Sequence, residues 1–309
     1  MIAVVSIAKN EEANIPALAE YARVLGDKWI VADTGSTDAT AARAAELGAE
    51  VHCLPWEGHG PTRNKAATLC EPCDWVVMPD ADEIIPEPER MRRGLEALDD
   101  GLVAAVVTWK IRGGYEYDRT LAWRPGYGKW KYRAHTQLFI DGPAARLEPL
   151  TIEHPGPVGR GISRDEYLPL LEADVADYPM DAGRHYYLGR QLYYAGRASG
   201  LAVLDRCVML SRSGPQKAKA LVYAGWLASD LGHQGLALAY FKTAAEIEPK
   251  MRGAYQGIIR VSPDRDERTQ AAEKALESDK PVFWDSAPVL YGDRADEWFR
   301  SVMERKGAA

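Results

Sequence analysis

The first half of the chain contains short apolar runs separated by polar and helix-forming stretches. The runs are rich in Val, Ile, Ala and Trp, a composition typical of buried strands. They lie at residues 2–8, 29–32, 50–54 and 75–78. A helix is expected after Asn14, where a polar capping residue precedes a proline in the first turn. Strands that alternate with helices in this way predict a parallel α/β sheet.

Six charged residues lie near the carboxyl ends of these predicted strands. They are Lys9, Asp33, Asp38, Arg63, Asp80 and Asp82. In parallel α/β sheets, ligands bind outside the carboxyl ends of the strands. We therefore expect these side chains to share one ligand site.

Asp80 and Asp82 stand one residue apart directly after the apolar run 75–78. On an extended backbone, side chains two positions apart point the same way. Two carboxylates in that arrangement repel each other unless they share a cation. Mg²⁺ and Mn²⁺ prefer oxygen ligands and bridge carboxylates to substrate phosphates. The pattern predicts a metal–diphosphate site, with a solvated turn as the alternative.

After about residue 160, strand-like runs give way to helical periods rich in Ala and Leu. Segments 187–196 and 223–232 resemble each other, and each is followed by a second predicted helix. Their offset is close to the tetratricopeptide period of about 34 residues. We expect two domains, at 1–162 and 163–309. Repeats of this type bind peptides or mediate association, so the second domain is a candidate for homo-oligomer formation, with an ordinary Ala-rich bundle as the alternative.

The overall composition narrows the classes of partner. The 309 residues include 38 Lys and Arg against 45 Asp and Glu, a net charge of −7. Such a chain has no general attraction for nucleic acid or anionic lipid. The sequence shows no apolar run of about 18 residues and no basic leader, so we expect a cytoplasmic protein without a membrane span. The four cysteines predict reduced thiols rather than a disulfide framework, and a zinc site at Cys70 and Cys73 is the alternative.

Four blocks of the first half resemble the family 2 glycosyltransferases of the GT-A fold. They are residues 6–12, 31–38, 63–64 and 80–83, and they arrive in the family's order. The resemblance implies a GT-A nucleotide-sugar-binding domain with a mainly parallel sheet. It also implies a metal-dependent glycosyltransferase that takes its sugar from a nucleotide sugar, a UDP-hexose.

The resemblance further implies which residues bind the nucleotide. Ile7, Lys9 and Glu11 would line the nucleoside. Asp33 would meet the base or the ribose, and Arg63 would face the diphosphate. The full set of implied nucleotide-binding residues is Ile7, Lys9, Glu11, Asp33, Gly35, Arg63 and Asp80.

The metal and its ligands are implied in the same way. Asp82 would bind Mn²⁺ or Mg²⁺, while Asp80 would meet the ribose or a metal-bound water. Many family members supply a histidine from a later strand, and His154 is the candidate here. His135 could compete with it, although its surroundings suggest the acceptor side.

The catalytic base is less well defined. An inverting transferase needs a carboxylate to accept the acceptor's proton. Family enzymes often carry it after the metal motif, where Glu116 and Asp118 are the candidates here. The usual Glu-Asp pair is absent, so the base and the stereochemistry stay open, and solvated loop charges are the alternative reading.

A family 2 domain joined to tetratricopeptide-like helices resembles the bacterial and phage group that includes peptide S-glycosyltransferases. The acceptor is then a peptide, a glycan or another molecule. Segment 123–135 is both aromatic and basic, which suits an acceptor or donor-sugar loop and leaves a nucleic-acid acceptor open. Its tryptophans could instead pack beneath the helical domain. A nucleotidyltransferase and a non-catalytic helical scaffold are the alternative functions.

Overall fold

The protein is represented by a computed structural model of the whole chain, which describes residues 1–111, 115–154, 164–278 and 293–304. The chain divides into two compact units, Met1–Gly161 and Ile162–Ala309. Each unit has its own apolar core. The assignment of these units as a transferase domain and a repeat-like domain stays a prediction.

The first unit is built on a seven-stranded mixed sheet with the order β3-β2-β1-β4-β6-β5-β9. Its parallel part comprises β1 (Ile2–Ala8), β2 (Lys28–Asp33), β3 (Glu50–Cys53) and β4 (Trp75–Val77). The remaining strands are β5 (Ala104–Ile111), β6 (Tyr115–Trp123) and β9 (Ala144–His154). β6 runs antiparallel to both β4 and β5, whereas β5 and β9 are parallel. The predicted α/β fold with a mainly parallel sheet is confirmed.

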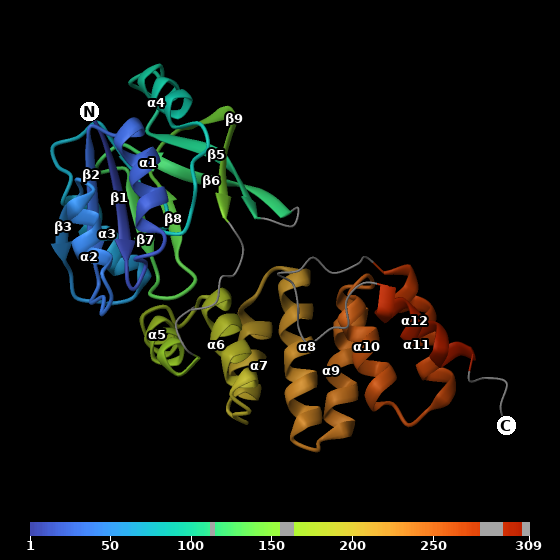
Figure 1. Cartoon of the computed structure of the whole chain (residues 1–309). Coiled ribbons are helices and arrows are strands. Elements are labelled where there is room, and N and C mark those ends of the chain that lie inside the picture. Colours follow the sequence, from blue (N-terminus) through green and yellow to red (C-terminus); the bar gives the residue numbers. More distant parts are fainter. Residues whose placement is uncertain (112–114, 155–163, 279–292, 305–309) are drawn as a thin grey trace. The chain divides into compact units, whose positions relative to one another are not determined.

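Helices cover both faces of this sheet (Figure 1). They are α1 (Ile15–Leu25), α2 (Thr40–Glu46), α3 (His59–Thr68) and α4 (Pro88–Glu96). Alternate residues of β1 enter different cores, because Val4 packs in the same cluster as Leu18 of α1, whereas Val5 packs in the same cluster as Ala66 of α3. Burial on both faces explains why the strand reads as one apolar run instead of an alternating pattern.

A two-stranded hairpin, β7 (Gly128–Lys131) and β8 (Gln137–Ile140), packs beside α3. Both amide atoms of the Asn64 side chain bond the backbone of Trp130, at 2.8 and 2.9 Å. The backbone N–H groups of His59 and Gly60 donate to the carbonyls of Arg133 and Tyr132. The first turn of α3 is thereby anchored to the loop between β7 and β8.

The second unit is helical, as predicted. Its helices are α5 (Arg164–Asp177), α6 (Ala182–Tyr194), α7 (Gly200–Leu210), α8 (Gly214–Asp230), α9 (Gln234–Ile247), α10 (Arg252–Val261), α11 (Arg265–Glu277) and α12 (Asp293–Glu304). The two similar segments fall on α6 and α8, each of which packs against the helix that follows it. Among the described residues, no helix is both long and apolar enough to cross a membrane. The tetratricopeptide assignment stays a prediction.

Glycines let the paired helices approach closely. A Cβ added at Gly189 of α6 would lie 2.5 Å from Leu204 of α7. A Cβ at Gly225 of α8 or Gly257 of α10 would lie 2.6 or 2.3 Å from the ring of Phe241 of α9. These distances are far below van der Waals contact, so the helices pack at the glycine backbone.

Replacing Gly257 with Ala is therefore expected to destabilise the second unit. Phe241 is fully buried, and it cannot retreat without moving its neighbours. Overpacking of this kind costs about 1–3 kcal/mol, which outweighs the gain of about 1 kcal/mol in helix propensity. Denaturant unfolding measures the change. Gly235→Ala is the matched control because a Cβ there meets nothing within 4 Å, and equal midpoints for the two variants would contradict the packing argument.

Candidate active site

The loops that follow β1 and β2 are joined by hydrogen bonds at the carboxyl edge of the sheet. The side-chain oxygen of Asn10 accepts the backbone N–H of Thr37 at 2.7 Å. The backbone N–H of Glu11 donates to the Thr40 hydroxyl, also at 2.7 Å. Lys9 lies exposed at the start of the first loop. This edge therefore presents a fixed rim, with three of the implied nucleotide-binding residues, Ile7, Lys9 and Glu11, in or next to it.

Asp33, the last residue of β2, is 6% exposed. Its Oδ2 accepts the backbone N–H groups of Gly35 and Ser36 at 3.1 and 3.2 Å. Gly35 has a φ of +96°, a conformation that favours glycine. The other oxygen, Oδ1, is buried and has no hydrogen-bond partner among the described residues. Since an unsatisfied buried acceptor is costly, this oxygen suits an N–H or O–H group of a ligand.

Asp80 lies between two arginines from different elements. The Arg63 guanidinium of α3 donates to its Oδ1, and Nη2 of Arg119 on β6 lies 3.7 Å from its Oδ2. Burial alone would raise the pKa of Asp80, but the two guanidinium groups hold that pKa well below its usual value. Asp80 is therefore ionised at neutral pH.

Arg63 is itself nearly buried and has further partners besides Asp80. Its guanidinium donates to the Thr136 hydroxyl at 2.7 Å and lies 4.6 Å from the centre of the Trp130 ring. Its side chain is 10% exposed. In the structure Arg63 contacts Asp80. The contact of Arg63 with a diphosphate stays a prediction. What the geometry shows is an arginine that positions a carboxylate.

Glu83 connects the turn formed by residues 80–83 to strands β5 and β6. The carboxylate is 1% exposed and accepts the backbone N–H of Asp80 at 2.8 Å and the Trp109 indole N–H of β5 at 2.7 Å. It also forms an ion pair with Arg119. Burial raises the pKa of Glu83, and Arg119 opposes that rise. Sequence reasoning gave Glu83, Trp109 and Arg119 no role, because their contact joins strands far apart along the chain.

Asp82 and His154 meet at the same edge. Oδ2 of Asp82 lies 3.2 Å from Nε2 of His154. The two are aligned by a backbone pair, in which Ile84 and Glu153 exchange N–H···O bonds of 2.9 Å in both directions. The hydrogen bond to Asp82 raises the pKa of His154, and partial burial opposes that rise. The structure thus brings the two implied metal ligands together.

Carboxylates lie around Asp82, and two of them, Asp80 and Glu83, are already paired with arginines. Burial raises the pKa of Glu11, and the charges of Asp82, Asp38 and Asp80 raise it further. Carboxylates gathered in this way favour a bound cation. Among the described residues, no group of three or more His, Cys, Asp or Glu side chains is arranged to hold a metal ion. Asp82 and His154 would supply an oxygen and a nitrogen ligand, which leaves the other positions to phosphate and water.

Glu116 and Asp118, the two candidates for the catalytic base, lie in the strand β6 and not in a loop. Arg119 points toward Glu83, and side chains alternate along a strand, so Glu116 and Asp118 face the opposite side. Oε2 of Glu116 lies 3.6 Å from the Lys110 ammonium, and Oδ2 of Asp118 accepts from Arg146 at 2.7 Å. The structure does not bring either carboxylate to Asp82, and their role as the base stays a prediction.

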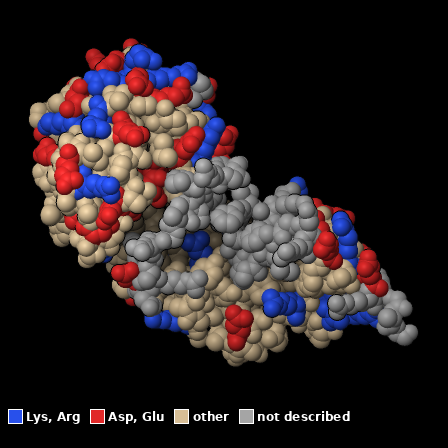
Figure 2. Space-filling view, in the orientation of Figure 1, with Lys and Arg blue, Asp and Glu red and all other residues tan. Residues whose placement is uncertain are grey.

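Segment 123–135 contains β7, and its tryptophans are packed inside. Trp123 and Trp130 are 2% and 7% exposed, and their rings are in edge contact at 6.2 Å. Tyr127 is 45% exposed. His135 lies between β7 and β8 with a φ of +47°. Both tryptophans belong to the apolar core of the first unit. Basic and acidic side chains are interspersed on the face of the first unit in Figure 2, and the role of the segment as an acceptor or donor-sugar loop stays a prediction.

The sequence profile of glycosyl transferase family 2 matches residues 3–164, more than half of the chain. The chain therefore belongs to glycosyl transferase family 2. The predicted family is confirmed, and the match favours a glycosyltransferase over a nucleotidyltransferase. The narrower resemblance to peptide S-glycosyltransferases stays a prediction.

Proteins with similar sequences are also named glycosyltransferases. Uncharacterized glycosyltransferases of Rickettsia bellii and Rickettsia felis are 40% and 42% identical over 77 residues, which is 25% of this chain. The aligned stretch spans 26% and 27% of those proteins. A crystal structure of glucosyl-3-phosphoglycerate synthase from Mycobacterium tuberculosis, in complex with Mn²⁺, UDP and glucosyl-3-phosphoglycerate, is 30% identical, with a TM-score of 0.32. It covers 37% of this chain and 45% of that one. Overlaps of this size leave the substrates open.

Proposed function

We propose that the protein transfers a hexose from a UDP-sugar to an acceptor, with Mn²⁺ or Mg²⁺ held by Asp82 and His154. The observation that carries the proposal is the 3.2 Å contact between these two side chains at the carboxyl edge of the sheet. A carboxylate and an imidazole are metal ligands, and their approach depends on a specific backbone pair between Ile84 and Glu153. The carboxylates around Asp82 add to the attraction for a cation.

The nucleoside would bind at the ends of β1 and β2. There the buried Oδ1 of Asp33 offers an acceptor to a base N–H or a ribose hydroxyl. Glu11 and Lys9 lie in the neighbouring loop, with Gly35 following Asp33. The diphosphate would then lie toward Asp82, where the negative charge of the leaving group builds up during transfer. A metal held by Asp82 and His154 would supply charge stabilisation for that leaving group.

Side chains of the protein hold the carboxylates of the turn 80–83 in fixed positions. Arg63 and Arg119 fix Asp80, and Arg119 and Trp109 fix Glu83. Prearranged groups of this kind need no reorganisation when charge develops, which is an efficient form of electrostatic catalysis. For the acceptor, we propose a peptide or a glycan, since paired helices such as those of the second unit commonly bind peptides.

Nucleotide binding gives the direct test. Asp33→Asn should weaken the binding of UDP about 10- to 100-fold, because Asn puts an N–H or a neutral oxygen where the carboxylate would accept a charge-assisted hydrogen bond. Isothermal titration calorimetry with UDP and Mn²⁺ measures the change. Asp99→Asn, at an exposed position away from the sheet edge, is the control. If both variants bind UDP as tightly as the parent protein, Asp33 is not part of the site.

A further inference from the structure

We propose that Cys70 and Cys73 form a dithiol site that exchanges with small-molecule disulfides and closes to an intramolecular disulfide. The two residues span the loop that joins α3 to β4. They lie outside the proposed active site.

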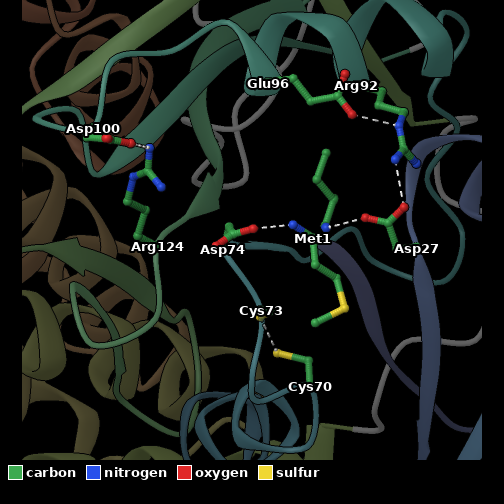
Figure 3. Close-up of polar contacts among 10 residues, drawn as sticks. Met1, Asp27, Cys70, Cys73, Asp74, Arg92, Glu96, Asp100 and Arg124 are labelled. Atoms are coloured by element: carbon green, nitrogen blue, oxygen red, sulfur yellow. Dashed lines mark hydrogen bonds and ion pairs between the residues drawn. The ribbon is translucent and has the colours of Figure 1, made fainter.

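The two sulfurs are already close together. Their Sγ atoms lie 3.2 Å apart, and both cysteines are free thiols (Figure 3). A disulfide bond is about 2.05 Å long, so closing it asks the sulfurs to approach by about 1 Å. A shift of that size needs a change of side-chain rotamers within one short loop and leaves α3 and β4 in place.

The two thiols differ in exposure, and this difference determines which of them reacts first. Cys70 is fully buried, and its thiol also donates to the carbonyl of Ala67 at 3.0 Å. Cys73 is half-buried, so it can meet a small disulfide from solvent. The hydrogen-bond contact between the two sulfurs lowers the pKa of Cys73, and the same contact, together with burial, raises the pKa of Cys70. The accessible thiol is thus also the better nucleophile.

The chemistry balances with a disulfide RSSR as the oxidant. The Cys73 thiolate attacks one sulfur of RSSR, which forms a mixed disulfide and releases one thiolate RS⁻. The Cys70 thiol then gives up its proton to the released thiolate and attacks the sulfur of Cys73. The second RS⁻ leaves and takes a proton from solvent. Two protein thiols are oxidised, and one RSSR is reduced to two RSH.

The position of the loop gives the disulfide a structural consequence. Directly after Cys73, the backbone N–H of Asp74 donates to the carbonyl of Met1, and the Asp74 carboxylate pairs with the Met1 amino group (Figure 3). At its other end the loop leaves α3, the helix that carries Arg63. A closed disulfide therefore fixes the connection between the helix of Arg63 and the strand that leads to Asp80.

The test uses the full chain and oxidised glutathione at neutral pH. The expected product has a Cys70–Cys73 bond that dithiothreitol reverses and no glutathione on either of these two residues. Peptide mapping by mass spectrometry locates the bond and any bound glutathione. Cys53 is the internal comparison, because it is more exposed than Cys73 and has no thiol beside it among the described residues.

Two variants separate the roles of the cysteines. Cys70→Ser should keep glutathione on Cys73 as a stable mixed disulfide, and Cys73→Ser should leave Cys70 reduced. The proposal is overturned if the parent protein retains glutathione on Cys73. It is also overturned if both thiols stay reduced at a concentration that modifies Cys53.

Discussion

Asp82→Asn is expected to reduce sugar transfer at least about a hundredfold while the protein stays folded. The substitution keeps the size of the side chain but removes the charge that would bind the metal beside His154. The side chain of Asp82 is 39% exposed in the turn that follows β4, so little packing is lost. Transfer or hydrolysis of UDP-glucose in the presence of Mn²⁺ measures the activity. Unchanged thermal unfolding shows that the fold is retained.

The metal itself provides a second readout for the same variant. Mn²⁺ should strengthen UDP binding to the parent protein and should have little effect on the variant. Asp99→Asn should behave as the parent in both assays. If Asp82→Asn turns over at a near-normal rate in buffer treated with EDTA, the metal assignment is wrong.

Arg119→Met is expected to lower the free energy of unfolding of the first unit by about 3–5 kcal/mol. Removing the guanidinium leaves the carboxylate of Glu83, which is 1% exposed, without its cation. An uncompensated buried charge is the main source of the loss, and Asp80 loses its second arginine as well. Urea unfolding, followed by tryptophan fluorescence, measures the midpoint and slope.

Two further variants isolate the cause. Arg146→Met removes an exposed arginine paired with Asp118 and should cost less than about 1 kcal/mol. Adding Glu83→Gln to Arg119→Met should recover part of the lost stability, because the buried charge is then gone. A double variant less stable than Arg119→Met would show that packing, rather than charge, explains the loss.

The ends of the parallel strands could be predicted because their signals are local. Asp33 and Asp82 follow short apolar runs, and a run of that kind marks a strand without any knowledge of its neighbours. The proposed metal-binding role of His154 had no local signal, since its partner Asp82 is reached through the pairing of Ile84 with Glu153. The family resemblance supplied it.

The antiparallel half of the sheet was harder to predict. Glu116 and Asp118 were the candidates for the base because they follow the metal motif, with solvated loop charges as the alternative reading. β6 instead points them away from the turn 80–83, and the charged residue that does reach the turn is their neighbour Arg119. Which of two adjacent side chains faces a site depends on strand register, and register is set by contacts that a local pattern does not contain.

The pairing of Ile84 with Glu153 also fixes an order of assembly. Proteins are synthesised from the amino terminus, and domains can begin to fold as they emerge. β1, β2 and β4, with Asp33 and Asp82, leave the ribosome well before β9, the strand that carries His154. A nascent chain can thus form the edge that would hold the nucleotide before it can complete the proposed metal pair. The chain would therefore be able to bind the nucleotide before β9 is synthesised, and it would be able to catalyse transfer only afterwards.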